Sequence, residues 1–123
     1  MSLSIETRPA DARTMLVFLH GELDYATAQD VRVTISAALS ANAIRSIVVD
    51  IAGVRFLDST GVGTLVVARR ICADCNVAFR LRNPNPFVAK LLTVVGVAEA
   101  LGVTPVPGIR PRRPVDDPAA QPA

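Results

Sequence analysis

The sequence predicts an α/β domain with one central mixed sheet of four to five strands and about four helices packed mainly on one face. Three observations predict this fold class. Half of the 123 residues are hydrophobic, which suits one compact domain with a single core. Short apolar runs rich in β-formers alternate with longer runs of helical periodicity. Gly, Pro, Asn and Asp residues stand at the boundaries between these runs.

Two strands and a helix are expected in the first 41 residues. The run "SIETRPA" is broken by Pro9 and Asp11 before "TMLVFLH" supplies a second run, and a hairpin is the simplest connection. Gly21 ends the second run. Asp24 then stands where a helix N-cap is expected, ahead of apolar residues at helical spacing. We therefore predict a first helix over Tyr25 to Ala41.

The middle of the chain predicts a buried strand, a polar turn and a second helix. The run "RSIVVDI", Arg45 to Ile51, has consecutive β-branched residues, typical of a strand covered on both faces. The stretch "RFLDSTGVG", Arg55 to Gly63, then places an acidic residue, two hydroxyls and two glycines in one turn. Because "VGTLVVARRI" is apolar over a wide arc, the second helix is expected to be among the most buried.

One more strand and two more helices are expected before the composition changes. The run "VAFRLR", Val77 to Arg82, alternates apolar and polar residues, which indicates a strand with one wet face. Asn85 as N-cap, Pro86 at the first helical position and Gly96 at the stop delimit a third helix. The run "VAEALG", ended by Gly102, predicts a short fourth helix, and "VTPV" predicts a further edge strand.

Composition divides the chain into a folded domain, residues 1–106, and a tail, residues 107–123. Six of the nine prolines occur from Pro105 onward, together with Arg110, Arg112 and Arg113. This segment has too little apolar material to form a core, so we expect the tail to be disordered.

Charge and targeting signals exclude several classes of partner. The 13 basic and 11 acidic residues give a net charge of +2, no basic block lies outside the tail, and aromatic content is 4%. A nucleic-acid partner is therefore not expected. The N-terminus has neither a basic flank nor a long apolar segment, so we expect no signal peptide, no membrane partner and a cytoplasmic location.

The two cysteines, Cys72 and Cys75, have the C-x-x-C spacing of dithiol sites and of half a zinc site. The second half of a zinc site is missing, because the single histidine, His20, lies far upstream. The cysteines also fall in the last turn of the second helix rather than ahead of a helix. We expect two reduced, partly buried thiols and no metal or cofactor, with a redox role left open.

The Arg55–Gly63 turn does not match the motifs of catalytic or nucleotide-binding turns. A hydrolase elbow requires G-x-S-x-G, but Leu57 stands two residues before Ser59, and only His20 is available as a base. The turn also lacks G-x-x-x-x-G-K-[ST] and a third glycine for G-x-G-x-x-G. Weak anion or nucleotide binding at a helix N-terminus stays open.

A local structural interpretation also accounts for this turn. In it, Ser59 or Thr60 caps the second helix and Asp58 complements the helix dipole. Gly61 and Gly63 then allow the helix to pack closely against the sheet. Spacing alone favours this interpretation over any specific site.

Three stretches resemble the anti-sigma-factor antagonists built on the STAS domain, a family of partner-switching regulators. The stretches are "GELDYATA" at 21–28, "SIVVDIAGVRFLDSTGVGTLVVARR" at 46–70 and, more loosely, "NPNPFVAKLLTVVGVAEAL" at 83–101. The middle stretch is the specific one. The resemblance covers nearly all of the folded part and implies a single STAS-like domain over residues 1–106.

The resemblance assigns roles to residues of the turn. The serine after the Asp of the D-S-[ST]-G motif is the phosphoacceptor in this family, which implies Ser59, with Asp58 before it. Thr60 stands beside it, and a role as second acceptor stays open. Asp24 corresponds to an acidic residue near that serine, although a simple N-cap explains Asp24 equally well. We also expect the partner to contact the exposed side of the second helix, including Arg69 and Arg70.

The implied activity is binding rather than catalysis. Such an antagonist, when unphosphorylated, captures an anti-sigma factor that is also a serine kinase and so releases the sigma factor. Phosphorylation of the antagonist ends the capture, and a phosphatase resets it. The alternative is a STAS-type small-ligand or nucleotide sensor without a phosphorylation switch.

Overall fold

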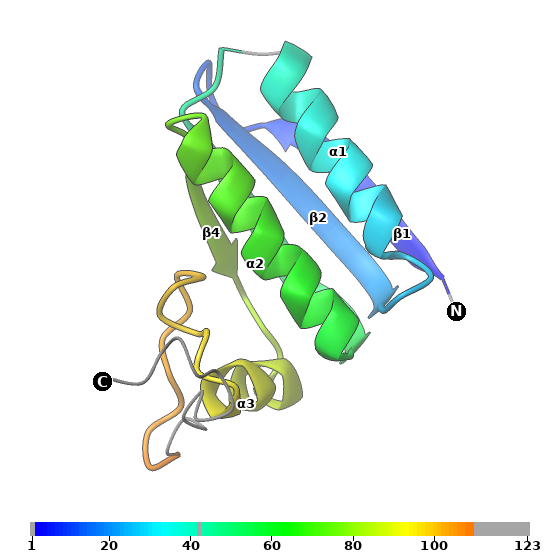
Figure 1. Cartoon of the computed structure of the whole chain (residues 1–123), viewed down its shortest axis with the longest axis vertical. Coiled ribbons are helices and arrows are strands. Elements are labelled where there is room, and N and C mark those ends of the chain that lie inside the picture. The colour runs from blue at the N-terminus through cyan, green and yellow to red at the C-terminus, as the bar shows by residue number, and fades with distance from the viewer. Residues whose placement is uncertain (1, 42, 110–123) are drawn as a thin grey trace, which may run out of the picture.

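Four strands form one mixed sheet in the order β1-β2-β3-β4 (Figure 1). The computed structural model describes residues 2–41 and 43–109. Strand β1 is antiparallel to β2, whereas β3 is parallel to both β2 and β4. The elements follow each other as β1 (Leu3–Pro9), β2 (Thr14–Leu23), α1 (Ala28–Ala41), β3 (Ser46–Leu57), α2 (Ser59–Asp74), β4 (Ala78–Arg82) and α3 (Pro86–Val94).

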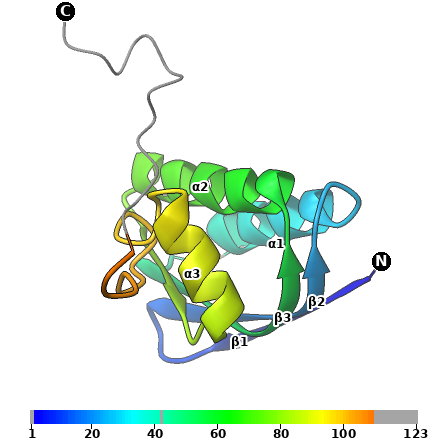
Figure 2. The same cartoon turned by 90° about the horizontal axis from the view of Figure 1, so that it is seen from below.

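Helices α1 and α2 lie side by side on one face of the sheet (Figures 1 and 2). The core fills the space between them and the sheet, with fully buried residues such as Val31 and Ile35 of α1 and Leu65 of α2. Helix α3 lies apart from this layer, and the Asn85 side chain before it donates a hydrogen bond of 2.8 Å to the Val54 carbonyl of β3. The predicted mixed α/β sheet with helices mainly on one face is therefore confirmed.

The predicted residues that begin and end α3 are also confirmed. Asn85 caps the helix by accepting the Val88 N–H at 2.8 Å, and Pro86 is the first helical residue. Gly96 follows the helix with a φ of 80°, in the left-handed region that glycine adopts without strain.

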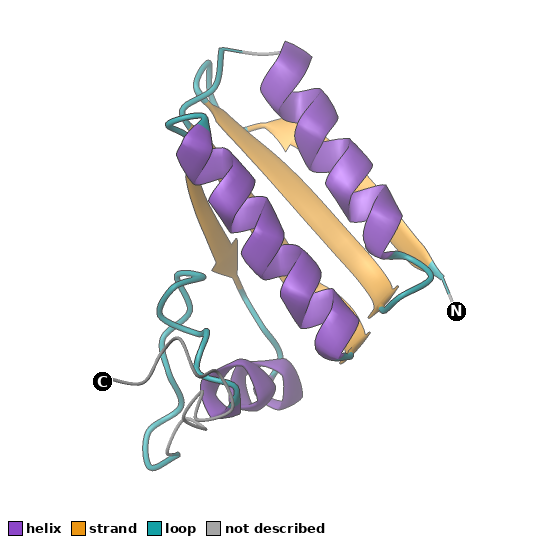
Figure 3. Ribbon diagram, in the orientation of Figure 1, coloured by secondary structure: helices purple, strands orange, loops and turns teal. Residues whose placement is uncertain are grey.

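The expected fourth helix and fifth strand are wrong (Figure 3). Residues 98–102 form a turn, because the left-handed glycines Gly96 and Gly102 leave too few residues between them for a regular helix. In this turn Leu101 donates to Val97 and Ala98, and Gly102 ends it. The "VTPV" segment that follows forms no strand. Among the described hydrogen bonds, the turn before it is joined to β4 by one, from the Leu81 N–H to the Leu101 carbonyl.

Two strands extend further than the sequence predicted. Strand β2 continues through Gly21 to Leu23, and β3 continues beyond Ile51 to Leu57. Gly21 has a φ of +119°, and a Cβ there would overlap the Ser2 carbonyl oxygen, so glycine serves a close approach within the sheet rather than ending the strand. The β2–β3 pairing also has two register shifts, which break the alternating pattern that predicts strands.

A buried carboxylate within β3 is bonded to residues at the end of β4. Asp50 Oδ1 accepts the Ala52 N–H at 2.9 Å, and Asp50 Oδ2 accepts Arg82 Nε and Asn83 Nδ2, both at 2.9 Å. Burial alone would raise the pKa of Asp50. The three hydrogen bonds and the charge of Arg82 outweigh that effect and hold the pKa below its ordinary value.

We expect Asp50→Asn to remove part of the acid dependence of folding. Because the folded pKa of Asp50 is depressed, its ionised form stabilises the fold above the unfolded pKa, and this contribution is lost as pH falls through the folded value. At pH 7 the variant should lose about 1–2 kcal/mol, since a hydrogen-bonded charge is replaced. Urea unfolding between pH 7 and pH 3 measures both effects. Parallel pH profiles for the two proteins would contradict the assignment.

The two cysteines are free thiols in different environments. Cys72 is buried in the last turn of α2, and its burial, with a smaller effect of Cys75, raises the pKa of the Cys72 thiol to about 11. Cys75 is the C-cap and is exposed, so the expectation of two partly buried thiols is wrong for both residues. Cys72 is thus protonated and unreactive at neutral pH.

The described chain continues to Ile109. The Val106 N–H donates to Thr93 Oγ1 at 3.0 Å, so this segment packs back onto α3. The greater part of the predicted disordered tail, residues 110–123, lies outside the described residues. None of the helices in the described ranges combines the length and the apolar character that crossing a bilayer requires.

Candidate phosphorylation site

The candidate site lies where the parallel strands β2 and β3 end. Leu23 and Leu57 are partners in the sheet, so the residues that follow them, Asp24 and Asp58, leave the sheet at the same edge. The Asp58 N–H also points to the Leu23 carbonyl at 3.4 Å. Figure 2 shows the ends of these two strands beside the beginnings of α1 and α2. The sheet register therefore unites two stretches that are more than 30 residues apart.

Asp58 is the N-cap of α2. Its backbone is extended, with φ −101° and ψ −176°, and its Oδ1 accepts the Gly61 N–H at 2.8 Å. Its carbonyl accepts the Val62 N–H at 2.9 Å. The expectation that Ser59 or Thr60 caps the helix is wrong, because the last residue with extended backbone is Asp58.

This capping leaves the Ser59 hydroxyl available. Ser59 is the first residue of α2 and is exposed, and within the described part of the chain its side chain makes no hydrogen bond. Thr60 is half-buried, and its carbonyl accepts the Thr64 hydroxyl at 2.9 Å. Of the two neighbouring hydroxyls, Ser59 is therefore the more accessible.

The two glycines of the turn differ in their surroundings. A Cβ at Gly61 would overlap the Leu23 carbonyl oxygen and lie 2.7 Å from Leu57 Cδ1. Gly61 therefore allows the first turn of α2 to pass directly over the ends of β2 and β3. A Cβ at Gly63 would meet nothing within 4 Å, so the predicted packing role is right for Gly61 and wrong for Gly63.

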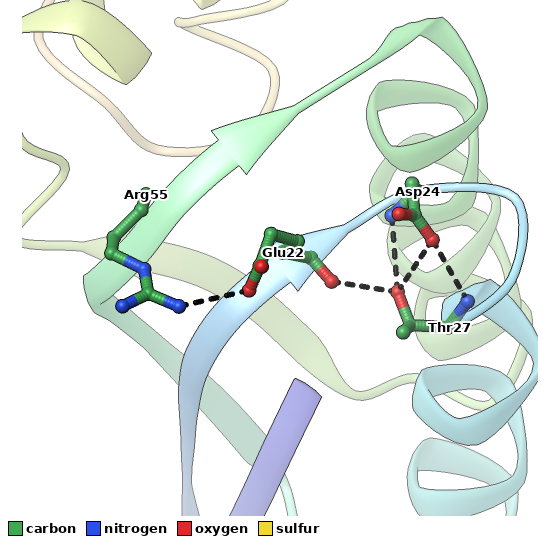
Figure 4. A network of polar contacts seen from close by, with 4 residues as sticks. All are labelled: Glu22, Asp24, Thr27 and Arg55. Carbon is green, nitrogen blue, oxygen red and sulfur yellow. Dashed lines mark hydrogen bonds and ion pairs between the residues drawn. The ribbon is translucent and has the colours of Figure 1, made fainter. Parts of the chain in front are cut away.

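Asp24 is held in a turn that leads into α1 (Figure 4). The residue is buried, and its Oδ1 accepts the Thr27 N–H at 3.1 Å while Thr27 Oγ1 accepts the Asp24 N–H at 3.0 Å. The Thr27 hydroxyl also donates to the Glu22 carbonyl at 2.8 Å. This reciprocal pair agrees with the predicted capping by Asp24. The predicted start at Tyr25 is wrong, because residues 25–27 form the turn and regular helix begins at Ala28.

An ion pair beside this turn had no signal in the sequence. Arg55 Nη2 of β3 lies 3.1 Å from Glu22 Oε2 of β2, as Figure 4 shows. The two residues are 33 positions apart, so no local motif links them. Arg55, the basic residue of the Arg55–Gly63 stretch, is therefore paired with a carboxylate of the neighbouring strand β2.

The arrangement fits a hydroxyl that accepts a phosphate. The beginning of α2 offers backbone N–H groups and the positive end of the helix dipole, both of which favour an anion. The carboxylates of Asp24 and Asp58 lie at the two adjoining turns.

The sequence of residues 4–108 matches the model of the STAS domain family. The chain belongs to the STAS domain family. Among its relatives is the anti-sigma F factor antagonist of Lysinibacillus sphaericus, which is 31% identical over 84 residues, covering 68% of this chain and 72% of the relative. The protein of the same name from Paenibacillus polymyxa is 26% identical over 89 residues, covering 72% and 76%. The resemblance predicted from the sequence is therefore confirmed at the level of the family.

Solved structures share this fold. The anti-sigma factor antagonist SpoIIAA in its unphosphorylated form aligns with a TM-score of 0.67 at 25% identity, covering 85% of this chain and 90% of that chain. An anti-sigma factor antagonist from Mycobacterium paratuberculosis aligns with a TM-score of 0.74 at 21% identity, covering 86% and 88%. The latter likeness concerns the fold alone.

Proposed function

We propose that this STAS domain protein is an anti-sigma-factor antagonist switched by phosphorylation of Ser59. In the unphosphorylated form it binds an anti-sigma factor that is a serine kinase, and the sigma factor is thereby released. The observation that carries the proposal is the exposed Ser59 hydroxyl at the first position of α2, which makes no hydrogen bond within the described residues, in a chain related to anti-sigma F factor antagonists.

The geometry of the turn supports Ser59 as the acceptor. Asp58 supplies the cap, so the serine hydroxyl is not required to hold the helix. Gly61 brings the first turn of α2 against the end of β2, next to Asp24. In the proposal, Asp24 and Asp58 give the site its shape and negative charge. Thr60 lies beside the acceptor, and Gly61 fixes the position of the helix turn that carries Ser59.

Charge accounts for the switch. A phosphoserine adds roughly −1.5 to −2 charges at neutral pH. The new charge would stand next to Asp58 and close to the turn of Asp24, while Arg55, near the end of β3, is already paired with Glu22. The surface therefore becomes strongly anionic, and a partner that presents carboxylates or apolar groups to it is repelled.

The chemistry of phosphate transfer belongs to the partners in this proposal. The kinase uses ATP and Mg²⁺, a separate phosphatase removes the phosphate, and this protein is a substrate and binding module rather than an enzyme. It would act in the cytoplasm, where ATP and the sigma factor are found.

The proposal predicts one phosphate on Ser59. Each serine kinase of the anti-sigma class from the source organism is incubated with the protein and Mg-ATP, and intact mass spectrometry with peptide mapping follows. The wild-type chain and Thr60→Ala should each gain one phosphate, and Ser59→Ala none. A phosphate retained on Thr60 in Ser59→Ala would contradict the assignment. No phosphate with any such kinase would favour the ligand-sensing alternative.

A further inference from the structure

Among the described residues, strand β1 has one edge without a partner strand. It is the first strand of the sheet and pairs only with β2 (Figure 1). In an antiparallel ladder every second residue is hydrogen-bonded to the neighbouring strand, and the residues between point their backbone groups away from it. Ser2 and Ala10, which flank β1, are both bonded to β2. The even-numbered residues therefore bond to β2, and the backbone N–H and C=O groups of Leu3, Ile5 and Thr7 face outward.

An apolar groove of about 430 Å³ lies beside this edge, between β1 and α1. Ile5 and Thr7 line it from the strand, and Val33 and Ala37 line it from the helix. Val33 is 56% exposed although it is a large hydrophobic side chain, and Ala37 follows it one turn later on the same side of α1. The edge thus offers both outward-facing backbone groups and apolar surface, which are the two features that an added strand uses.

Two side chains of opposite charge lie on the other face of β1. Side chains alternate along a strand, so Glu6 and Arg8 point away from the groove that Ile5 and Thr7 line. Within one chain Glu6 Oε1 and Arg8 Nε are 3.5 Å apart, and both side chains are more than half exposed, so each has room for a further partner. Glu6 and Arg8 flank Thr7, so the edge carries opposite charges on the two sides of one residue.

We propose that β1 pairs with β1 of a second copy of this chain, antiparallel and about a two-fold axis at Thr7. Each Thr7 then exchanges backbone hydrogen bonds with Thr7 of the second copy, and each Ile5 N–H donates to a Pro9 carbonyl of the other copy. Each Glu6 faces Arg8 of the second copy, so the interface contains two pairs of opposite charge. Pro9 has no N–H to donate, which limits the pairing to this short stretch.

Self-complementarity identifies the second copy as the occupant of this edge. In a two-fold interface, if residue i meets residue j, then residue j also meets residue i. Glu6 and Arg8 satisfy this condition about Thr7, because their charges are opposite. With the axis moved to Ile5, the next register in which outward-facing residues meet, Glu6 would face Ser4 and no charge pair would form.

The pairing leaves the candidate phosphorylation site uncovered. Thr7 pairs with Val17 of β2, six residues before Leu23, so the axis is about 20 Å along the strand from the turn at Ser59. Both copies of α1 lie on the same side of the joined sheet, where Val33 of each copy lines the groove. Self-association through β1 is therefore independent of the proposed function, and the two are tested separately.

Charge reversal tests the facing pairs. In sedimentation velocity the full chain should exchange between monomer and dimer at loading concentrations from about 1 µM to about 1 mM. Glu6→Arg and Arg8→Glu each place two like-charge pairs in the dimer, so the dissociation constant should rise at least about tenfold. Both side chains are exposed, so an unchanged far-UV circular dichroism spectrum serves as the folding control.

Combining the two changes should restore the dimer. An equimolar mixture of Glu6→Arg and Arg8→Glu forms heterodimers in which both facing pairs are again of opposite charge. The double variant Glu6→Arg/Arg8→Glu has the net charge of the wild type, and its dissociation constant should lie within about threefold of the wild-type value. A monomer at every concentration, single variants that dimerise as the wild type does, or a double variant that stays monomeric would each overturn the proposal.

The outward-facing amides report on the edge itself. In a dilute monomer the N–H groups of Ile5 and Thr7 should exchange rapidly with solvent, because they point away from β2. Their protection, measured by NMR, should rise at least about tenfold between about 10 µM and about 1 mM, whereas that of Glu6, which faces β2, should change little. Rapid exchange at every concentration would overturn pairing through β1. Strong protection in a monomer would mean that another segment of the chain covers the edge, which would overturn the second copy as its occupant.

Val33→Glu tests the groove. A carboxylate there would stand beside the axis on both copies of α1, so the dissociation constant should rise at least about tenfold. The matched control is Val67→Glu, which changes a 40% exposed valine on α2, a helix that lies farther from β1 than α1 does (Figure 1). Equal effects of the two variants would show that the groove is outside the interface and would overturn the proposed pairing.

Discussion

Ser59→Asp is expected to bind the anti-sigma-factor kinase about a hundredfold more weakly than Ser59→Ala. Juxtaposed like charges across an interface cost on the order of several kcal/mol, and each ~1.4 kcal/mol changes affinity tenfold. After screening by solvent, we expect the binding free energies of the two variants to differ by about 2.7 kcal/mol, which corresponds to about a hundredfold in affinity. Phosphoserine carries more charge than aspartate, so the phosphorylated wild-type protein should bind more weakly still.

Calorimetric titration of the kinase with both variants measures this ratio. Unphosphorylated wild type should resemble Ser59→Ala, because the serine hydroxyl carries no charge. Raising the ionic strength from about 0.05 M to about 0.5 M should narrow the gap between the variants, since salt screens a repulsion between exposed charges. Equal affinities at low salt would show that charge at residue 59 is not the switch.

The same charge should leave the fold intact. Ser59 is exposed and Asp58 caps the helix, so neither substitution removes a structural contact. A negative charge in the first turn of a helix stabilises it by roughly 0.3–1 kcal/mol. Far-UV circular dichroism of the two variants and of the phosphoprotein should therefore coincide, which separates a local electrostatic switch from a conformational one.

Local chemistry was enough to predict the elements whose ends depend on their own residues. The cap Asn85, the leading Pro86 and the terminating Gly96 define α3 as the structure has it. Strand ends were harder to predict. Gly21 lies within β2 rather than at its end, because the Ser2 carbonyl oxygen of the neighbouring segment leaves no room for a side chain there. The run "VAEALG" predicts a helix where the structure has a turn at residues 98–102, because helical spacing over so few residues does not distinguish a helix from a turn.

The candidate site was predicted in part. The position of Ser59 at a strand-to-helix turn follows from the sequence, but the register that places Asp24 beside that turn is a property of the sheet. The Glu22–Arg55 pair depends on the same register. The two glycines look alike in the sequence, and only their surroundings show that Gly61 is required by the fold and Gly63 is not.

Gly61→Ala is expected to destabilise the protein by about 2 kcal/mol or more. Overpacking a tight site costs about 1–3 kcal/mol and occasionally more, because neighbouring atoms have to move. At Gly61 the obstructing atom is the backbone oxygen of Leu23, which cannot rotate away as a side chain can. The helix propensity of alanine offsets roughly 1 kcal/mol, so a loss of this size implies displacement of α2 from the sheet.

Thermal and urea unfolding of Gly61→Ala, with Gly63→Ala as the matched control, tests this argument. Both variants add one methyl group to the first turns of the same helix, so helix propensity alone predicts the same gain for both. The structure predicts opposite signs, with a fall of about 5–10 °C in Tm for Gly61→Ala and no fall for Gly63→Ala. Since Asp24 and Ser59 are positioned by the contact between β2 and α2, Gly61→Ala should also slow phosphorylation of Ser59. A stable Gly61→Ala protein with unchanged phosphorylation would mean that the two turns are not held together at this contact.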